Sequence, residues 1–195
     1  MTDANTLAEQ MKQWRVGGAS LGAPLLSKPS FGGDAGRNYS LWNNKVRLYA
    51  QHENQTFGIN LGFTDNDSAA TEQKVRRWFF TSNAGDTIHY GDVIAIGNGG
   101  DPSFIFNKHR ATGVDLEYKS SAVSEWQLLG GSIGQPVLAG DTVALFNTHN
   151  QLPLIHFKRT AGGEFGWPDS QTWAQQIGLD VGDLIPVAVA LLKAL

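Results

Sequence analysis

The five histidines of this chain, at positions 52, 89, 109, 149 and 156, are its main candidates for acid–base or metal chemistry. None of them forms His-Glu-x-x-His or another close metal-binding spacing. The chain has no cysteine, which excludes disulfides, thiol catalysis and thiolate metal sites. The sequence therefore predicts neither a metal site nor a cofactor.

Two Gly-x-Ser-x-Gly matches, at 18–22 and 130–134, could mark a serine nucleophile. Such a nucleophile needs a strand before the serine and a helix after it. Ser20 and Ser132 are each followed by a proline four positions later, so neither serine opens a helix. In a chain with 23 glycines we interpret both matches as turns, and we expect no enzymatic activity.

Polar residues around two of the histidines suit a sugar ligand. Planar amides and carboxylates pair with adjacent hydroxyl groups, while an aromatic face packs on the C–H surface of the ring. Trp167, between glycine and proline, is the best aromatic candidate. The competing interpretation is that the polar residues are there because they tolerate unusual backbone angles in turns. The predicted ligand-binding residues are His52, Asn54, Asn147, His149, Asn150, Trp167 and Asp169.

The elements that must position these side chains are predicted to be mostly short strands. Residues 3–15 carry a helical stripe of Leu7, Met11 and Trp14, and the glycine- and proline-rich stretch to residue 40 is typical of loops. From Lys45 onward, short apolar runs alternate with turn residues. This pattern predicts an all-β fold.

A pattern of about 48 residues occurs three times, with starts at Asn44, Asp92 and Asp141. It places His52 and His149 at equivalent positions, in the turn between the first two strands of the first and third repeats. We expect the aromatic residue near the end of each repeat to fill a shared core. These residues are Trp78, Trp126 and Trp173.

The pattern resembles the β-trefoil superfamily. Gln171-Thr172-Trp173 is similar to the Gln-x-Trp motif of ricin-B-type lectins, although positions 76–78 and 124–126 depart from it. Gly91–Asn98 and Gly140–Asn147 are similar to the Gly-Asp-x-Val-Ala-Leu-x-Asn segment of fascin-like trefoils. The resemblance implies a β-trefoil of three repeats with about four strands each.

The resemblance also implies the organisation of the chain. It divides the chain into an N-terminal helix and loop extension (1–40), a β-trefoil domain (41–180, with repeats of about 41–86, 87–135 and 136–180) and an apolar C-terminal segment (181–195). Residues 184–192 are predicted as a helix rather than a further strand. Because this segment is apolar nearly all round, either the N-terminal helix covers it or a homodimer does.

The composition and the hydropathy pattern limit the kinds of partner that we expect for this protein. With 15 basic and 18 acidic residues and a net charge of −3, the chain lacks the electrostatic footprint of a nucleic-acid-binding protein. No apolar run reaches the length of a transmembrane helix, and the polar N-terminus is unlike a signal peptide. We therefore expect a protein that is cytoplasmic or released without a cleaved signal peptide.

These observations favour a non-enzymatic, carbohydrate-binding (lectin-like) module whose partners are glycans or glycoproteins. Two alternatives stay open. One is a protein-interaction module of the fascin-like type, and the other is the cell-recognition part of a membrane-acting toxin.

Overall fold

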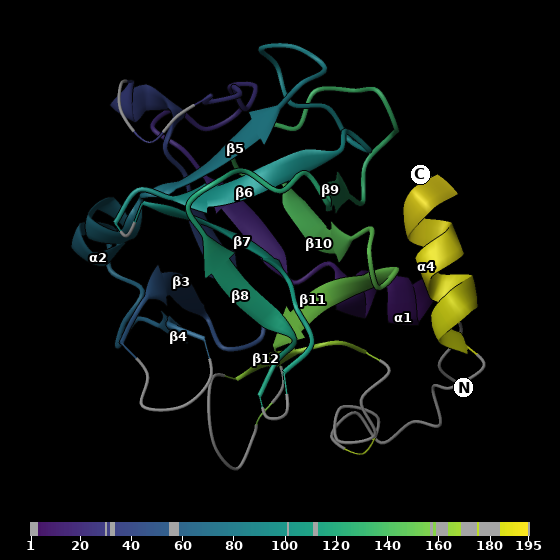
Figure 1. The fold of residues 1–195 in the computed structure, drawn as a ribbon. Coiled ribbons are helices and arrows are strands. Elements are labelled where there is room, and N and C mark those ends of the chain that lie inside the picture. The colour runs from purple at the N-terminus through teal and green to yellow at the C-terminus, as the bar shows by residue number, and fades with distance from the viewer. Residues whose placement is uncertain are drawn as a thin grey trace.

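The fold is known from a computed structural model, which describes residues 4–29, 31, 34–54, 59–100, 102–110, 113–156, 158, 164–168, 175 and 184–194. Twelve strands in these ranges form one antiparallel sheet that curls around the core (Figure 1). They are β1 (Trp14–Gly17), β2 (Ser40–Asn43), β3 (Leu48–His52), β4 (Leu61–Phe63), β5 (Trp78–Ser82), β6 (Ile94–Asn98), β7 (Ser103–Asn107), β8 (Leu116–Lys119), β9 (Trp126–Leu129), β10 (Thr142–Asn147), β11 (Leu152–His156) and β12 (Phe165–Gly166). The prediction of an all-β class is therefore correct.

The prediction of a β-trefoil is wrong, because the strands are joined into a single sheet. Its main path runs β4-β3-β2-β1-β10-β9-β6-β7-β8, with β11, β12 and β5 paired to its side. Strand β1 pairs with both β2 and β10, so it joins the early strands of the sheet to the later ones. It lies before residue 41, where the first repeat was expected to begin. Alternating apolar runs indicate strands, but they do not specify which strands pair.

The predicted start of the first repeat also differs structurally from the starts of the other two. Asn44 lies in the turn after β2, whereas Asp92 and Asp141 lie in turns before β6 and β10. The side chains of Asp92 and Asp141 accept the backbone N–H groups of the residues three positions earlier, which stabilises these two turns. Asn44 has no such place in the fold, so the three starts are not equivalent.

One pair of buried residues does recur three times across neighbouring strands. Tryptophan stands opposite asparagine in each case, with the pairs Trp14–Asn43, Trp78–Asn98 and Trp126–Asn147. Every indole N–H donates a hydrogen bond to a backbone carbonyl, those of Leu154, Ala50 and Ile105 respectively. Trp78 and Trp126 are buried, as predicted, while Trp173 lies outside the described residues.

The three asparagine side chains hold the turns that follow their strands. Each Oδ1 accepts the backbone N–H group two residues further along, at Lys45, Gly100 and His149. A buried amide must also satisfy its own N–H groups, so the residues around each asparagine are constrained as well.

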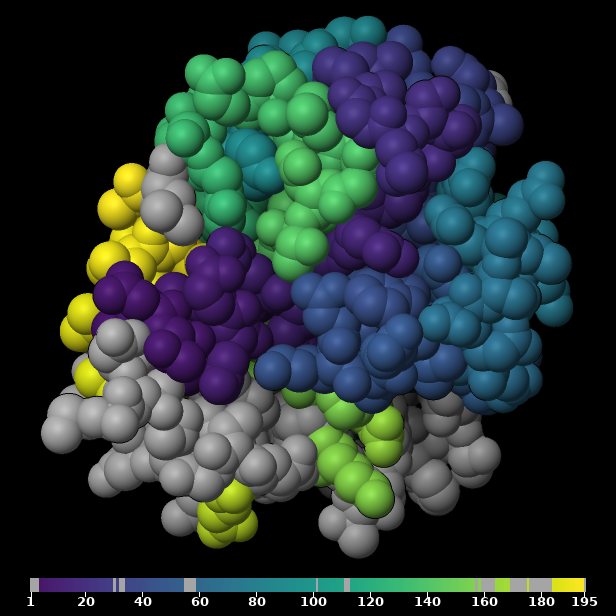
Figure 2. All heavy atoms as spheres, turned by 180° about the vertical axis from the view of Figure 1, so that it is seen from behind, coloured from purple at the N-terminus to yellow at the C-terminus, as the bar shows by residue number. Residues whose placement is uncertain are grey.

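Three α-helices lie outside the sheet in the described ranges: α1 (Ala4–Met11), α2 (Ala69–Val75) and α4 (Leu184–Ala194). A short 3-10 turn, η1 (Ala35–Arg37), precedes β2. Helices α1 and α4 lie side by side against one flank of the sheet, which is visible from both sides (Figures 1 and 2). None of the described helices is long and apolar enough to cross a membrane.

The C-terminal helix is confirmed, and α1 covers it. Ile185, Ala188, Val189 and Leu192 are buried in a cluster with Leu7 and Met11 of α1 and apolar residues of the sheet. The N-terminal helix is shorter than predicted, because it ends at Met11 and the chain then extends into β1 at Trp14.

We expect the buried tryptophans to contribute strongly to stability. Trp126→Phe removes the hydrogen bond to Ile105 and leaves a cavity, and it should lower the free energy of unfolding by about 2–4 kcal/mol. The partly exposed Trp42 supplies the control, since Trp42→Phe should cost less than about 1 kcal/mol. Urea denaturation measures both values, and equal losses would contradict this assignment.

Candidate functional site

The predicted binding residues are spread over several elements. His52 is the last residue of β3, whereas His149 lies in the turn between β10 and β11, so the two are not at equivalent positions. His52 is partly buried, with its ring 5.6 Å from that of Tyr118, and Asn54 follows it on the exposed surface. His149 is exposed.

Asn147 and Asn150 shape the β10–β11 turn. Asn147 is fully buried, and its Oδ1 accepts the N–H groups of His149 and Asn150. Its Nδ2 donates to Glu125 Oε1 at 2.9 Å, so its side chain is occupied within the protein. The Oδ1 atom of Asn150 accepts the N–H of Leu152.

Trp167 belongs to the main hydrophobic core. Its ring stacks on that of Trp126, with the centroids 6.3 Å apart and the planes 26° apart. Its indole Nε1 is buried and has no hydrogen-bond partner among the described residues. Asp169 lies outside the described residues.

Both Gly-x-Ser-x-Gly segments form turns, as the sequence indicates. The Ser20 carbonyl accepts the N–H of Ala23, and the Ser132 carbonyl accepts the N–H of Gln135. The last glycine of each match, Gly22 and Gly134, has a positive φ (78° and 83°) that favours glycine.

A pocket of about 290 Å³ brings together the polar and aromatic side chains best suited to a small ligand. We call it the Trp42 pocket. The purple, blue and green segments that carry these residues meet on the face shown in Figure 2. It is lined by Arg15, Gly17, Leu21, Ser40, Trp42, Tyr49, Glu72 and Gly140.

Three adjacent strands position one side of the Trp42 pocket. Arg15 of β1 pairs with Trp42 of β2, which in turn pairs with Tyr49 of β3. Paired residues of neighbouring strands project from the same face of a sheet, so these three side chains form a row. The Arg15 guanidinium lies over the Trp42 ring, 4.3 Å from its centroid, in a cation–π contact.

Glu72 of α2 also lines the Trp42 pocket. Its helix begins after Ser68, whose Oγ accepts the N–H of Thr71 and caps the first turn. Glu72 Oε1 accepts the Ser40 hydroxyl at 3.0 Å and Arg76 Nη2 at 3.3 Å.

Tyr49 and Gly17 lie next to the Glu72 carboxylate. The Tyr49 hydroxyl donates to Glu72 Oε2 at 3.5 Å, and burial followed by the Glu72 charge raises the pKa of Tyr49. At Gly17, a Cβ atom would lie 2.2 Å from Ser40 Oγ and 2.7 Å from Glu72 Oε1. A side chain at position 17 would therefore have to displace the Ser40 hydroxyl and the Glu72 carboxylate from their present positions.

Sequence reasoning missed the Trp42 pocket because its residues come from three strands, a helix and two turns that were not expected to meet. Ser68 as an N-cap and Glu72 in the first turn are local signals for α2. In the part of the chain that the structure describes, no three histidine, aspartate or glutamate side chains gather as metal ligands would.

Comparisons of this chain with protein-family models, with curated proteins and with solved structures found no match. The function must therefore be inferred from the site.

Removal of the Glu72 charge should lower the pKa of Tyr49. Glu72→Gln keeps a hydrogen-bond acceptor but removes the negative charge that disfavours the tyrosinate. We expect one tyrosine to ionise at lower pH in an absorbance titration at alkaline pH. Tyr49→Phe identifies that tyrosine, and an unchanged titration in Glu72→Gln would contradict the contact.

Proposed function

We propose that the protein is a non-enzymatic carbohydrate-binding module and that the Trp42 pocket holds a sugar ring. The observation that carries this proposal is the combination of an aromatic ring, a carboxylate and a guanidinium around one small pocket. Its volume is at the lower end of the range for ligand pockets, about 300–1,000 Å³, which suits one ring rather than a long chain.

The donors and acceptors complement a sugar. Hydroxyl groups of a sugar both donate and accept, so a site for them needs both functions side by side. Glu72 supplies acceptor oxygens, and the exposed Arg15 supplies N–H donors. Trp42 and the largely exposed Leu21 offer apolar surface for the C–H face of the ring.

Pre-organisation also supports binding at this pocket. Ser40, Arg76 and Tyr49 hold the Glu72 carboxylate, and the cross-strand pairing holds Arg15 against Trp42. Side chains that are already ordered lose little conformational entropy when a ligand binds. This favours the pocket over the β10–β11 turn, where Asn147 is occupied by Glu125 and by the turn itself.

A glycan array followed by titration of the best glycan tests this function. We expect Trp42→Ala to weaken binding by at least about tenfold, because it removes the aromatic surface, and Glu72→Gln to weaken it by a similar factor. His149→Ala, at an exposed position in a turn outside the pocket, is the matched control and should bind like the parent protein.

The outcomes separate the competing ideas. Loss of binding in His149→Ala with retention in Trp42→Ala would move the site to the β10–β11 turn. An array on which the folded protein binds no glycan would overturn the carbohydrate function.

A further inference from the structure

We infer a second site, for a phosphate or sulfate group, at the junction around Asn98. A junction is defined here as a buried Trp–Asn pair together with the residue that precedes the tryptophan. The three junctions contain Gln13, Arg77 and Glu125 as the preceding residue. They differ in how the asparagine amide is satisfied.

Two junctions are closed by the protein's own side chains. Asn43 Nδ2 donates to Gln13 Oε1 at 3.3 Å, and the same oxygen accepts the N–H of His156 at 2.8 Å. Asn147 Nδ2 donates to Glu125 Oε1 at 2.9 Å, and this oxygen also accepts the N–H of Asn107. In both cases an acceptor side chain lies beside the buried amide.

The third junction has donors where the other two have an acceptor. Asn98 is only 2% exposed, and its Oδ1 accepts the N–H of Gly100 at 2.8 Å. Its Nδ2 has no acceptor among the described residues, since Arg77 precedes the tryptophan and a guanidinium only donates. This leaves one donor group of an almost wholly buried side chain to be paired by an acceptor from outside the chain.

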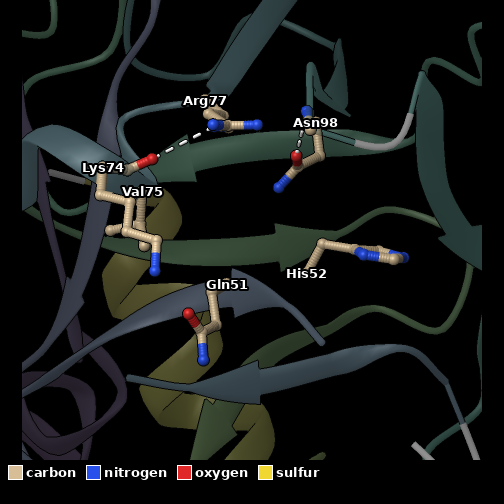
Figure 3. A pocket seen from close by; sticks show the side chains of 7 residues that line it. Gln51, His52, Lys74, Val75, Arg77 and Asn98 are labelled. Atoms are coloured by element: carbon tan, nitrogen blue, oxygen red, sulfur yellow. Dashed lines mark hydrogen bonds between the residues drawn. The ribbon is translucent and has the colours of Figure 1, made fainter. Parts of the chain in front are cut away.

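A pocket of about 200 Å³ opens at this position. Figure 3 shows the amide nitrogen of Asn98 directed into the space between Arg77, Lys74 and Gln51. Arg77 Nε donates to the Lys74 carbonyl at 3.1 Å, which fixes the guanidinium at the rim. The described lining consists of Gln51, His52, Lys74, Val75, Arg77, Asn98 and Gly100.

The charge of this pocket selects an anion. None of the described residues that line it is acidic, and neither Lys74 nor Arg77 forms an ion pair with a described residue. Arginine matches the oxygens of phosphate and sulfate with parallel N–H donors, and lysine adds a point charge. Asn98 Nδ2 would then donate to a further oxygen of the same group.

Two substitutions of Arg77 test this site first. Arg77→Glu and Arg77→Gln introduce the same acceptor side chains that Glu125 and Gln13 provide at the other two junctions. The new side chain would accept the Asn98 N–H and so occupy the place of the anion. Both variants should fold, and both should weaken the binding of inorganic phosphate and sulfate at least about tenfold in isothermal titration of the full chain. Lys74→Gln changes only an exposed side chain and should weaken binding by a smaller factor.

Lys45→Glu is the matched control. Lys45 is exposed and occupies, after Asn43, the turn position that Gly100 occupies after Asn98. This substitution changes the net charge as much as Arg77→Glu does, and phosphate binding should be retained. Equal losses in Lys45→Glu and Arg77→Glu, no saturable binding to the parent protein, or full binding in both Arg77 variants would overturn the site.

Methyl phosphate distinguishes the two sources of the anion. Tighter binding of methyl phosphate than of inorganic phosphate identifies an ester as the natural ligand, and the reverse order identifies the free anion. Both orders support the site. The readout is independent of glycan binding, because Trp42→Ala should leave phosphate affinity unchanged.

Discussion

The sheet depends on the indole N–H bonds of three buried tryptophans. Trp14, Trp78 and Trp126 donate to carbonyls that lie 140, 28 and 21 positions away in the sequence. The bond of Trp14 is the most consequential, since it fastens the N-terminal strand to β11. β1 lies between β2 and β10 and pairs with both, so it joins β2, β3 and β4 to the later strands of the sheet. The aromatic rings also supply much of the buried apolar area.

This arrangement places polar side chains in the core that must be hydrogen-bonded. The residue opposite each tryptophan is an asparagine, whose oxygen is used to hold the following turn. Its N–H group must then be paired inside a region that water barely reaches. Gln13 and Glu125 meet that requirement within the chain, while Arg77 does not. A position that is structural in two places thereby becomes available for binding in the third.

Local patterns in the sequence were sufficient for the strands, the core tryptophans Trp78 and Trp126 and the C-terminal helix. Local patterns failed where a residue's hydrogen-bond or packing partners are distant in the sequence. Trp14 fits a helical stripe with Leu7 and Met11, yet it belongs to a strand because β2 and β10 offer it hydrogen-bond partners. The amides predicted to bind sugar are good turn formers, and Asn147 is used in that way. Pocket residues from three strands and a helix share no pattern along the chain.

The short helix α2 explains how two pockets of opposite chemistry arise close together. Residues two positions apart on an α-helix project about 200° apart, so Glu72 and Lys74 point to different sides of α2. Val75 is buried, and α2 contacts both β2 and β3. On one side, Glu72 is paired with Arg76 and with hydroxyl groups, which leaves a site of mixed donors and acceptors. On the other side Lys74 joins Arg77, and their positive charge lies beside the amide of Asn98, whose Nδ2 has no acceptor among the described residues. Because one helix lies between them, a change in its position would alter both sites together.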